Sequence, residues 1–200
     1  SQGSEILIVD NSDDNWKALK YLEGWAEISK SFDVASAYFE IGSLLALDGK
    51  WQGLEKLRIL MGEEVTLRTK KIFLEALSKK EKILNDSLEE EKEKNDFLSG
   101  VPAVVEAIKS GQIECRVYRK DKFHAKAYIT HAKHEVTGSA ALVGSSNFTF
   151  PGLTTNIELN VQLKHEVKQL QEWYERHWND AEPVSTEILN VIERHTRAYT

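Results

Sequence analysis

The chain has 200 residues, of which 41% are hydrophobic, 29% charged and 9% aromatic, a composition typical of a one-domain globular protein. Its formal net charge of −6 and pI of about 5.6 exclude a surface that attracts nucleic acid as a whole, so a polyanion needs a local basic patch. One cysteine, Cys115, excludes an intrachain disulfide and favours a reducing, cytoplasmic location, and no apolar run approaches the roughly 18 residues of a membrane span.

The first half of the chain predicts strands that alternate with helices. Residues 1–3 resemble a cloning remnant, so residues 4–200 are expected to form a single domain, excised from a larger protein. A strand or extended arm comes first, then a helix, a buried strand, a helix broken at Gly49, and two further strands. In chain order these elements cover residues 5–9, 15–30, 34–41, 42–57, 57–61 and 64–67.

Residues 69–98 predict a long charged helix with an apolar stripe. Its distal half, residues 86–96, holds six acidic residues against two lysines. Such a run is typical of a solvated helix arm, and a partner-binding or dimerising role is the alternative.

The second half predicts a sheet that is closed by helices. A helix over residues 101–110 is expected to be capped by Ser99 and to end at Gly111. Four strands and two helices follow, over residues 113–118, 123–130, 140–143, 156–163, 166–179 and 185–195. The last strands lie too close in the sequence for parallel crossovers, so the expected fold class is α/β with a mixed central sheet.

The segment that begins at Phe123 carries the first candidate site residues. On a strand, residues i and i+2 face the same side, so His124 and Lys126 are expected to project together. Phe123, Ala125 and Ala127 would then point to the opposite side. A neighbouring lysine disfavours the charged imidazolium and so leaves a neutral ring nitrogen that can attack phosphorus. The lysine can also hold a negatively charged phosphoryl group. An exposed polar face of an edge strand is the alternative.

Two later segments place polar residues beside apolar strands. Ser145, Ser146 and Asn147 follow a strand directly and offer neutral hydrogen-bond donors for phosphoryl oxygens. Glu158 is expected in the middle of an apolar strand, where a carboxylate is costly unless it is paired. It could orient an imidazole by accepting the Nδ1 proton. The alternative for the segment around Asn147 is an ordinary polar turn, and the alternative for the segment around Glu158 is an exposed face of an edge strand.

Taken together, these segments resemble the phospholipase D superfamily. The pattern is His-x-Lys at His124 and Lys126, then Gly-Ser-x-Asn-Phe-Thr around Asn147, then Glu158 eleven residues later. It is most similar to the nuclease branch, which has one such motif per chain. The resemblance implies an α/β/α sandwich with a mixed central sheet, to which this chain adds the long charged helical segment.

The resemblance also implies a role for each residue. His124 is the nucleophile that forms a covalent phosphohistidine, and Glu158 holds its ring. Lys126 and Asn147 bind the non-bridging phosphate oxygens, with Ser145 as a helper. The family needs no metal or cofactor, and its site uses two copies of the motif around a two-fold axis. The chain carries one complete copy, so a homodimer is implied.

One position departs from the lipid-cleaving branch of the family. That branch has an aspartate five residues beyond the lysine, where this chain has His131. The departure argues against a phospholipase. It leaves open an inactive descendant that binds its ligand without cleaving it.

A local reversal of charge precedes the first motif. Five basic residues occur within eleven positions, against the single acid Asp121: they are Arg116, Arg119, Lys120, Lys122 and Lys126. Such a patch can follow a phosphate backbone, and a basic turn before the strand is the alternative.

These features predict a metal-independent nuclease domain that acts on DNA, within a bacterial helicase or restriction-type protein. Two alternatives stay open: a non-catalytic DNA-binding or dimerisation module, and a lipid or small-molecule phosphodiesterase. No metal site is expected from His124, His131 and His134, because no carboxylate or cysteine lies at ligand spacing.

Overall fold

The computed structural model describes residues 7–65, 69–71, 73–74, 100–136 and 138–184. In this part of the chain, eight strands form one mixed sheet in the order β1-β7-β6-β5-β2-β3-β4-β8. Neighbouring strands are parallel at β2–β3 and β3–β4 and antiparallel at the other pairings. The strands are β1 (Ile8–Val9), β2 (Ser29–Phe39), β3 (Lys56–Val65), β4 (Ile113–Val117), β5 (Lys126–Ala132), β6 (Ser139–Gly144), β7 (Asn160–Leu163) and β8 (Glu182–Pro183). The expected mixed sheet is therefore confirmed.

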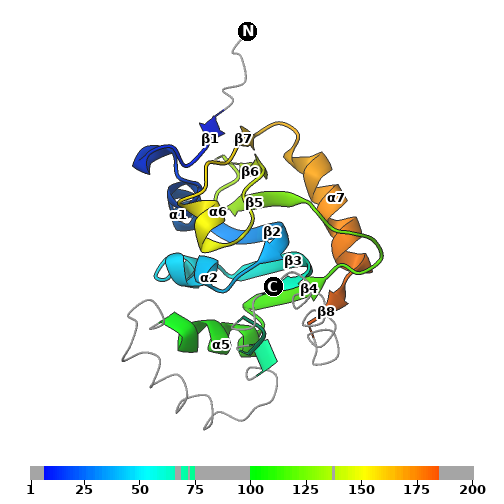
Figure 1. The fold of residues 1–200 in the computed structure, drawn as a ribbon. Coiled ribbons are helices and arrows are strands. Elements are labelled where there is room, and N and C mark those ends of the chain that lie inside the picture. The colour runs from blue at the N-terminus through cyan, green and yellow to red at the C-terminus, as the bar shows by residue number, and fades with distance from the viewer. Residues whose placement is uncertain (1–6, 66–68, 72, 75–99, 137, 185–200) are drawn as a thin grey trace.

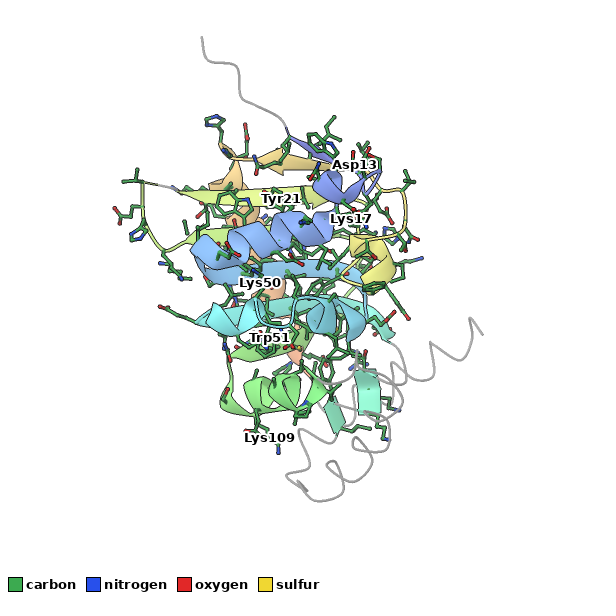
Figure 2. The ribbon with its side chains drawn as sticks, turned by 90° about the vertical axis from the view of Figure 1, so that its left-hand side faces the viewer. Asp13, Lys17, Tyr21, Lys50, Trp51 and Lys109 are labelled. Atoms are coloured by element: carbon green, nitrogen blue, oxygen red, sulfur yellow. The ribbon has the colours of Figure 1, made fainter. Side chains whose placement is uncertain are left out.

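Helices cover both faces of the sheet (Figure 1). One face carries α1 (Ala18–Ile28), α2 (Gly42–Ala46), α5 (Val101–Ser110) and α6 (Phe150–Leu153), and Figure 2 shows this face toward the viewer. The other face carries α7 (Val167–Asp180). Two short segments, Asp14–Trp16 and Trp51–Gly53, form 3-10 helices. The arrangement is the α/β/α sandwich that the resemblance implies.

Alternate residues of the central strands divide between two apolar clusters. Ile59 and Tyr128 belong to the larger cluster, which packs against α1, α2 and α5. Leu60 and Ile129, their neighbours in sequence, belong to a smaller cluster with Trp178 of α7. Because successive side chains of a strand point to opposite faces, these strands are apolar on both sides and lie at the centre of the fold.

The structure corrects several predicted boundaries. The two strands expected at 57–61 and 64–67 are one strand, β3, which continues through Gly62. A side chain there would place a Cβ atom 2.5 Å from the Ala37 carbonyl oxygen and 3.2 Å from that of Phe123, so glycine allows three segments to approach closely. The helix predicted over residues 42–57 is shorter than expected, because α2 ends at Ala46 and β3 begins at Lys56. Gly49, with a left-handed φ of 81°, lies in the turn between α2 and the 3-10 helix Trp51–Gly53.

Two site residues lie just outside the strands that were predicted to contain them. β5 begins at Lys126, so His124 lies in the segment before it. β7 begins at Asn160, so Glu158 also precedes its strand. The backbone N–H groups before β7 have other hydrogen-bond partners: the Glu158 N–H donates to the Asp10 carbonyl, and the Leu159 N–H donates to Ser145 Oγ.

Other predicted elements agree with the structure or lie outside its described part. The predicted helices at 101–110 and 166–179 correspond to α5 and α7. α5 begins after Gly100, without a side-chain cap, and ends at Gly111 with a φ of 83°. Residues 69–71 and 73–74 are helical, whereas the rest of the expected helix at 69–98, the helix at 185–195 and residues 1–3 lie outside the described residues.

A buried polar network joins α7 to the sheet. Asp33 of β2 accepts hydrogen bonds from Arg58 Nε at 2.7 Å and Gln171 Nε2 at 3.0 Å, and its Oδ2 lies 2.9 Å from His131 Nε2. Arg58 also binds the Glu175 carboxylate and lies over the Trp178 ring. Burial alone raises the pKa of Asp33, but these contacts outweigh it and lower the pKa to about 2.

Candidate active site

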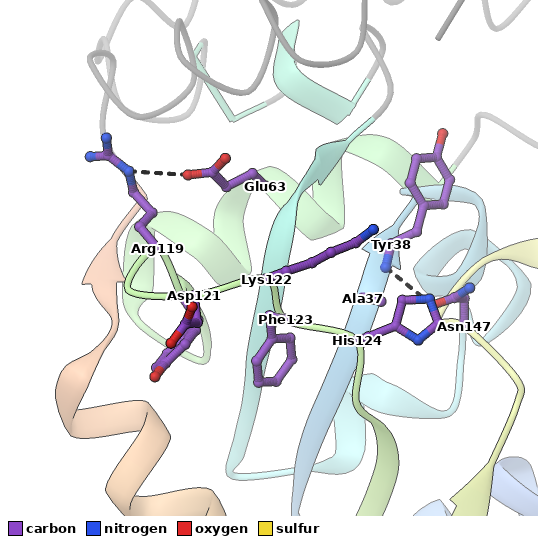
Figure 3. A pocket seen from close by; sticks show the side chains of 10 residues that line it. Ala37, Tyr38, Glu63, Arg119, Asp121, Lys122, Phe123, His124 and Asn147 are labelled. Atoms are coloured by element: carbon purple, nitrogen blue, oxygen red, sulfur yellow. Dashed lines mark hydrogen bonds and ion pairs between the residues drawn. The ribbon is translucent and has the colours of Figure 1, made fainter. Parts of the chain in front are cut away.

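A cavity of about 560 Å³ opens at the carboxyl ends of the parallel strands β2, β3 and β4 (Figure 3). This edge is where open α/β sheets bind ligands. Residues from four strand ends and one loop line the cavity: Ala37, Tyr38, Glu63, Tyr118, Arg119, Asp121, Lys122, Phe123, His124 and Asn147. Two of the four predicted site residues, His124 and Asn147, therefore share one cavity.

His124 and Lys126 meet as predicted, although a strand does not hold both. The Lys126 Nζ lies 3.1 Å from the imidazole Nδ1 and donates to the His124 carbonyl oxygen at the same distance. Phe123, Ala125 and Ala127 pack in the cluster beneath α7, which confirms their opposite orientation. Burial lowers the pKa of Lys126, while the charge of Glu158 acts in the opposite direction.

The contact with Lys126 determines which nitrogen of His124 can carry the proton. An ammonium group only donates, so Nδ1 accepts, and the neutral ring then has its proton on Nε2. In this state Nδ1 offers its lone pair to Lys126, and Nε2 is not a nucleophile. A phosphate that draws the Lys126 ammonium away would release Nδ1, and a carboxylate at Nδ1 would then free Nε2.

The side-chain amide of Asn147 has a defined orientation. Its Oδ1 accepts from the Tyr38 backbone N–H at 3.1 Å and lies 3.4 Å from Ser36 Oγ. Because the backbone N–H can only donate, the oxygen must face β2. The amide NH₂ is thereby left as the donor of this side chain at the cavity, the role expected for a group that binds phosphoryl oxygens.

Sequence reasoning missed the residues that hold the Asn147 loop. Asn160 is buried and donates to Ser146 Oγ and to the Val9 carbonyl, while its Oδ1 accepts from the Ser146 N–H. The hydroxyl of Tyr128 donates to the Ser146 carbonyl, and Ser36 accepts from the Phe148 N–H. The polar residues Ser36 and Asn160 within otherwise apolar strands are the signal that could have found them.

The structure pairs Glu158 with Ser145 rather than with His124. Ser145 Oγ donates to the Glu158 carboxylate and accepts from the Leu159 N–H at 3.0 Å. In this structure Ser145 therefore positions Glu158, and its contact with a phosphate stays a prediction. In this single chain the Nδ1 of His124 faces Lys126, so the expected support of the ring by Glu158 is not formed.

Gly144 sets the approach of the Glu158 segment. An added Cβ would collide with the Leu159 carbonyl oxygen and with Asn160. We therefore expect Gly144→Ala to lower the free energy of unfolding by at least about 1–3 kcal/mol, the usual cost of overpacking. Gly24→Ala is the matched control, because nothing lies within 4 Å of its Cβ and α1 should gain up to about 1 kcal/mol. Urea denaturation of both variants measures the difference, and equal stabilities would contradict the close approach.

Most of the predicted basic patch is neutralised. Arg116 lies over the Trp178 ring and donates to the Trp178 carbonyl, which separates it from the cavity. Arg119 pairs with Glu63 and with Glu182. Lys120 pairs with Asp180 at 2.8 Å. Arg119 and Lys122 line the cavity, so two of the five basic residues of the predicted patch lie there.

A second His-x-Lys triplet, at His131 and Lys133, does not build a second site. The His131 ring binds Asp33 in the buried network beneath α7. Lys133 Nζ lies 3.4 Å from the Glu27 carbonyl oxygen. The histidine that departs from the lipid-cleaving pattern is therefore part of the packing between sheet and helix.

Two kinds of feature are absent from the described residues. Among them, no three His, Cys, Asp or Glu side chains gather as a metal site would require. Likewise, none of the described helices has the length and apolar character needed to cross a membrane.

Comparison with known proteins identifies the family. Residues 29–178, three quarters of the chain, match the family described as "Cardiolipin synthase, PLD-like domain". The chain belongs to the phospholipase D-like family. No curated protein matches this phospholipase D-like sequence.

Solved structures share the fold at low sequence identity. NucT from Helicobacter pylori superposes with a TM-score of 0.54 at 13% identity, over 90% of this chain and 99% of NucT. Nuc from Salmonella typhimurium, a phospholipase D family member, gives 0.52 at 15%, over 91% and 99%. Polyphosphate kinase from Porphyromonas gingivalis gives 0.53 at 9%, but the match covers 24% of that chain.

The phospholipase D-like fold therefore occurs in proteins with different names and sizes. The superposition spans 99% of NucT and 99% of Nuc. Because one fold hosts several chemistries, the activity has to be argued from the side chains at the cavity.

Proposed function

We propose that the chain is a metal-independent phosphodiesterase that cleaves DNA through a phosphohistidine at His124. The observation that carries this proposal is that the His124 imidazole and the Asn147 amide line one cavity, while the Lys126 ammonium lies 3.1 Å from the imidazole Nδ1. A nucleophile, a cation and a neutral donor are the groups that phosphoryl transfer by covalent catalysis needs.

The proposed reaction has two steps at phosphorus. The phosphate first draws the Lys126 ammonium away from Nδ1 and accepts from the Asn147 amide. A ring nitrogen of His124 then forms a bond to phosphorus, the bond to the leaving oxygen breaks, and a general acid gives that oxygen its proton. In the second step water loses a proton to the same group and displaces His124, which restores the ring.

A homodimer completes the proposed site. The chain has one full motif, and the described part of the chain brings no second histidine to the cavity to act as the acid. A second copy can supply that acid from its own His124, and a carboxylate for Nδ1, if a two-fold axis passes beside the cavity. Ile157 and Leu159, which flank Glu158 and are 76% and 61% exposed, are apolar side chains suited to such an interface.

The most direct test is a nuclease assay in excess EDTA. We expect the protein to cleave a DNA oligonucleotide at the same rate with and without EDTA, because the side chains supply every charge that the reaction needs. Cleavage that EDTA abolishes and added Mg²⁺ restores would overturn the metal-independent mechanism. Binding of DNA without any cleavage would instead support the non-catalytic module. Cleavage restricted to lipids would support a lipid phosphodiesterase.

We also infer, from the resemblance, that this domain serves in a larger cytoplasmic protein of the helicase or restriction type. The net charge of −6 supports a domain that depends on a partner or a neighbouring domain to attract DNA. Copurification of the full-length protein with ATP-dependent DNA unwinding or cleavage is the expected result.

A further inference from the structure

The cavity beside His124 is larger and less basic than a single phosphate requires. Its two ends differ, as Figure 3 shows: Lys122 extends toward the end where Tyr38, His124 and Asn147 lie, while Arg119, Glu63 and Asp121 lie at the other end. The two basic and two acidic residues of the lining cancel. A volume of about 560 Å³ is within the range that holds a nucleotide-sized molecule.

The acidic end argues against a phosphate backbone that crosses the whole cavity. A nucleic-acid strand carries one negative charge per roughly 3.4 Å of its axis, so a second phosphate would come near Glu63 or Asp121. Arg119 offers little compensation, because Glu63 and Glu182 already pair with it. The group next to the reacting phosphate is therefore uncharged and able to donate hydrogen bonds to carboxylates.

The remaining walls fit a flat ring. Tyr38 places its side chain on the cavity while its backbone N–H stays bonded to Asn147, so the ring and the phosphate-binding amide are held by one residue. Tyr118 and Phe123 also line the cavity and pack against each other with ring centroids 5.5 Å apart. Stacking on an aromatic side chain accepts any base, and base edges carry the N–H donors that Glu63 and Asp121 can accept.

We propose that the cavity binds one unpaired nucleobase next to the cleaved phosphate, with Tyr38 as the stacking residue, so that single-stranded nucleic acid is the preferred substrate. This inference rests on the proposed phosphodiesterase function and specifies its substrate class. A base-paired nucleotide cannot enter a cavity of this size without leaving its partner, and that step costs free energy. A lipid is disfavoured because acyl chains carry no hydrogen-bond donors for the carboxylates of Glu63 and Asp121.

The test uses substrates with one phosphodiester bond. Thymidylyl-thymidine is compared with two analogues in which one or the other base is replaced by hydrogen, and a single-stranded 20-mer is compared with its duplex. We expect the value of kcat/KM to fall about tenfold or more when one particular base is missing, and duplex cleavage to be at least about tenfold slower. Tyr38→Leu should bring the ratio between thymidylyl-thymidine and that analogue close to one, whereas Tyr38→Phe, which keeps the ring, should preserve it.

The outcomes separate this inference from the function on which it rests. Equal rates on the dinucleotide and both analogues, equal rates on both 20-mers, or a ratio that Tyr38→Leu leaves unchanged, would overturn the base site while leaving the phosphodiesterase intact. Failure of the wild-type protein to cleave any of these substrates, with cleavage of phosphatidyl lipids in vesicles, would overturn the proposed function itself.

Discussion

Replacing His124 with alanine is expected to lower kcat for DNA cleavage by at least about three orders of magnitude. The substitution removes the atom that bonds to phosphorus. When residues act as one catalytic unit, the loss of one member abolishes most of the rate acceleration of the whole unit. Folding should be unaffected, because His124 is exposed and belongs to no strand. Steady-state rates and far-ultraviolet circular dichroism of the purified variant measure the two quantities.

His134→Ala is the matched control, since this histidine is exposed near the turn between β5 and β6, away from the cavity. It should cleave at the wild-type rate.

Adding excess His124→Ala protein to the wild type tests whether two chains share one active site. Mixed dimers would lower the rate below that of the wild-type fraction alone, whereas chains that act independently would leave the wild-type rate unchanged.

The second large effect is expected from Asp33. Its side chain is 5% exposed and pairs with Arg58 and His131, so Asp33→Ala leaves a partly buried guanidinium without its more buried partner. Removing one partner of a buried pair costs about 3–5 kcal/mol, and Glu175, which remains bound to Arg58, places the expected loss near the lower value. Asp14→Ala, which breaks an exposed pair with Lys17, should cost less than about 1 kcal/mol.

The same network predicts how stability depends on pH. The folded-state pKa of Asp33 is lowered from about 3.8 to about 2, so its ionised form contributes about 2 kcal/mol above pH 4. That contribution is lost as the pH falls from 4 through 2. In urea denaturation, the difference between wild type and Asp33→Ala should therefore be largest above pH 4 and shrink toward pH 2. A difference that stays constant over this range would contradict the pairing.

The parts of the fold and site that the sequence predicts are those that local patterns encode. The helix that ends at Gly111 follows from apolar spacing and a glycine stop, and the spacing of His124 and Lys126 places both side chains together even though β5 begins only at Lys126. The opposite orientation of Phe123 follows from the same alternation.

The missed features depend on contacts between distant parts of the chain. Glu158 is bound by Ser145, and Asn147 is oriented by the backbone of Tyr38, 109 residues away in sequence. Arg119 is part of a basic run in the sequence, but Glu182, 63 residues later, pairs with it in the fold. Periodicity and spacing carry no information about such partners. The prediction of a basic patch from the sequence therefore assigned more unpaired positive charge to the site than the fold leaves there.

The most direct measurement of the central claim is the identification of the covalent intermediate. Reactions with a single-stranded oligonucleotide are stopped with alkali, in which phosphohistidine survives, and the digested protein is analysed by mass spectrometry. Our account predicts a nucleotide phosphate attached to the peptide that contains His124, absent when the sample is treated with acid and absent from His124→Ala. An adduct on another side chain, or continued cleavage by His124→Ala at the wild-type rate, would contradict it.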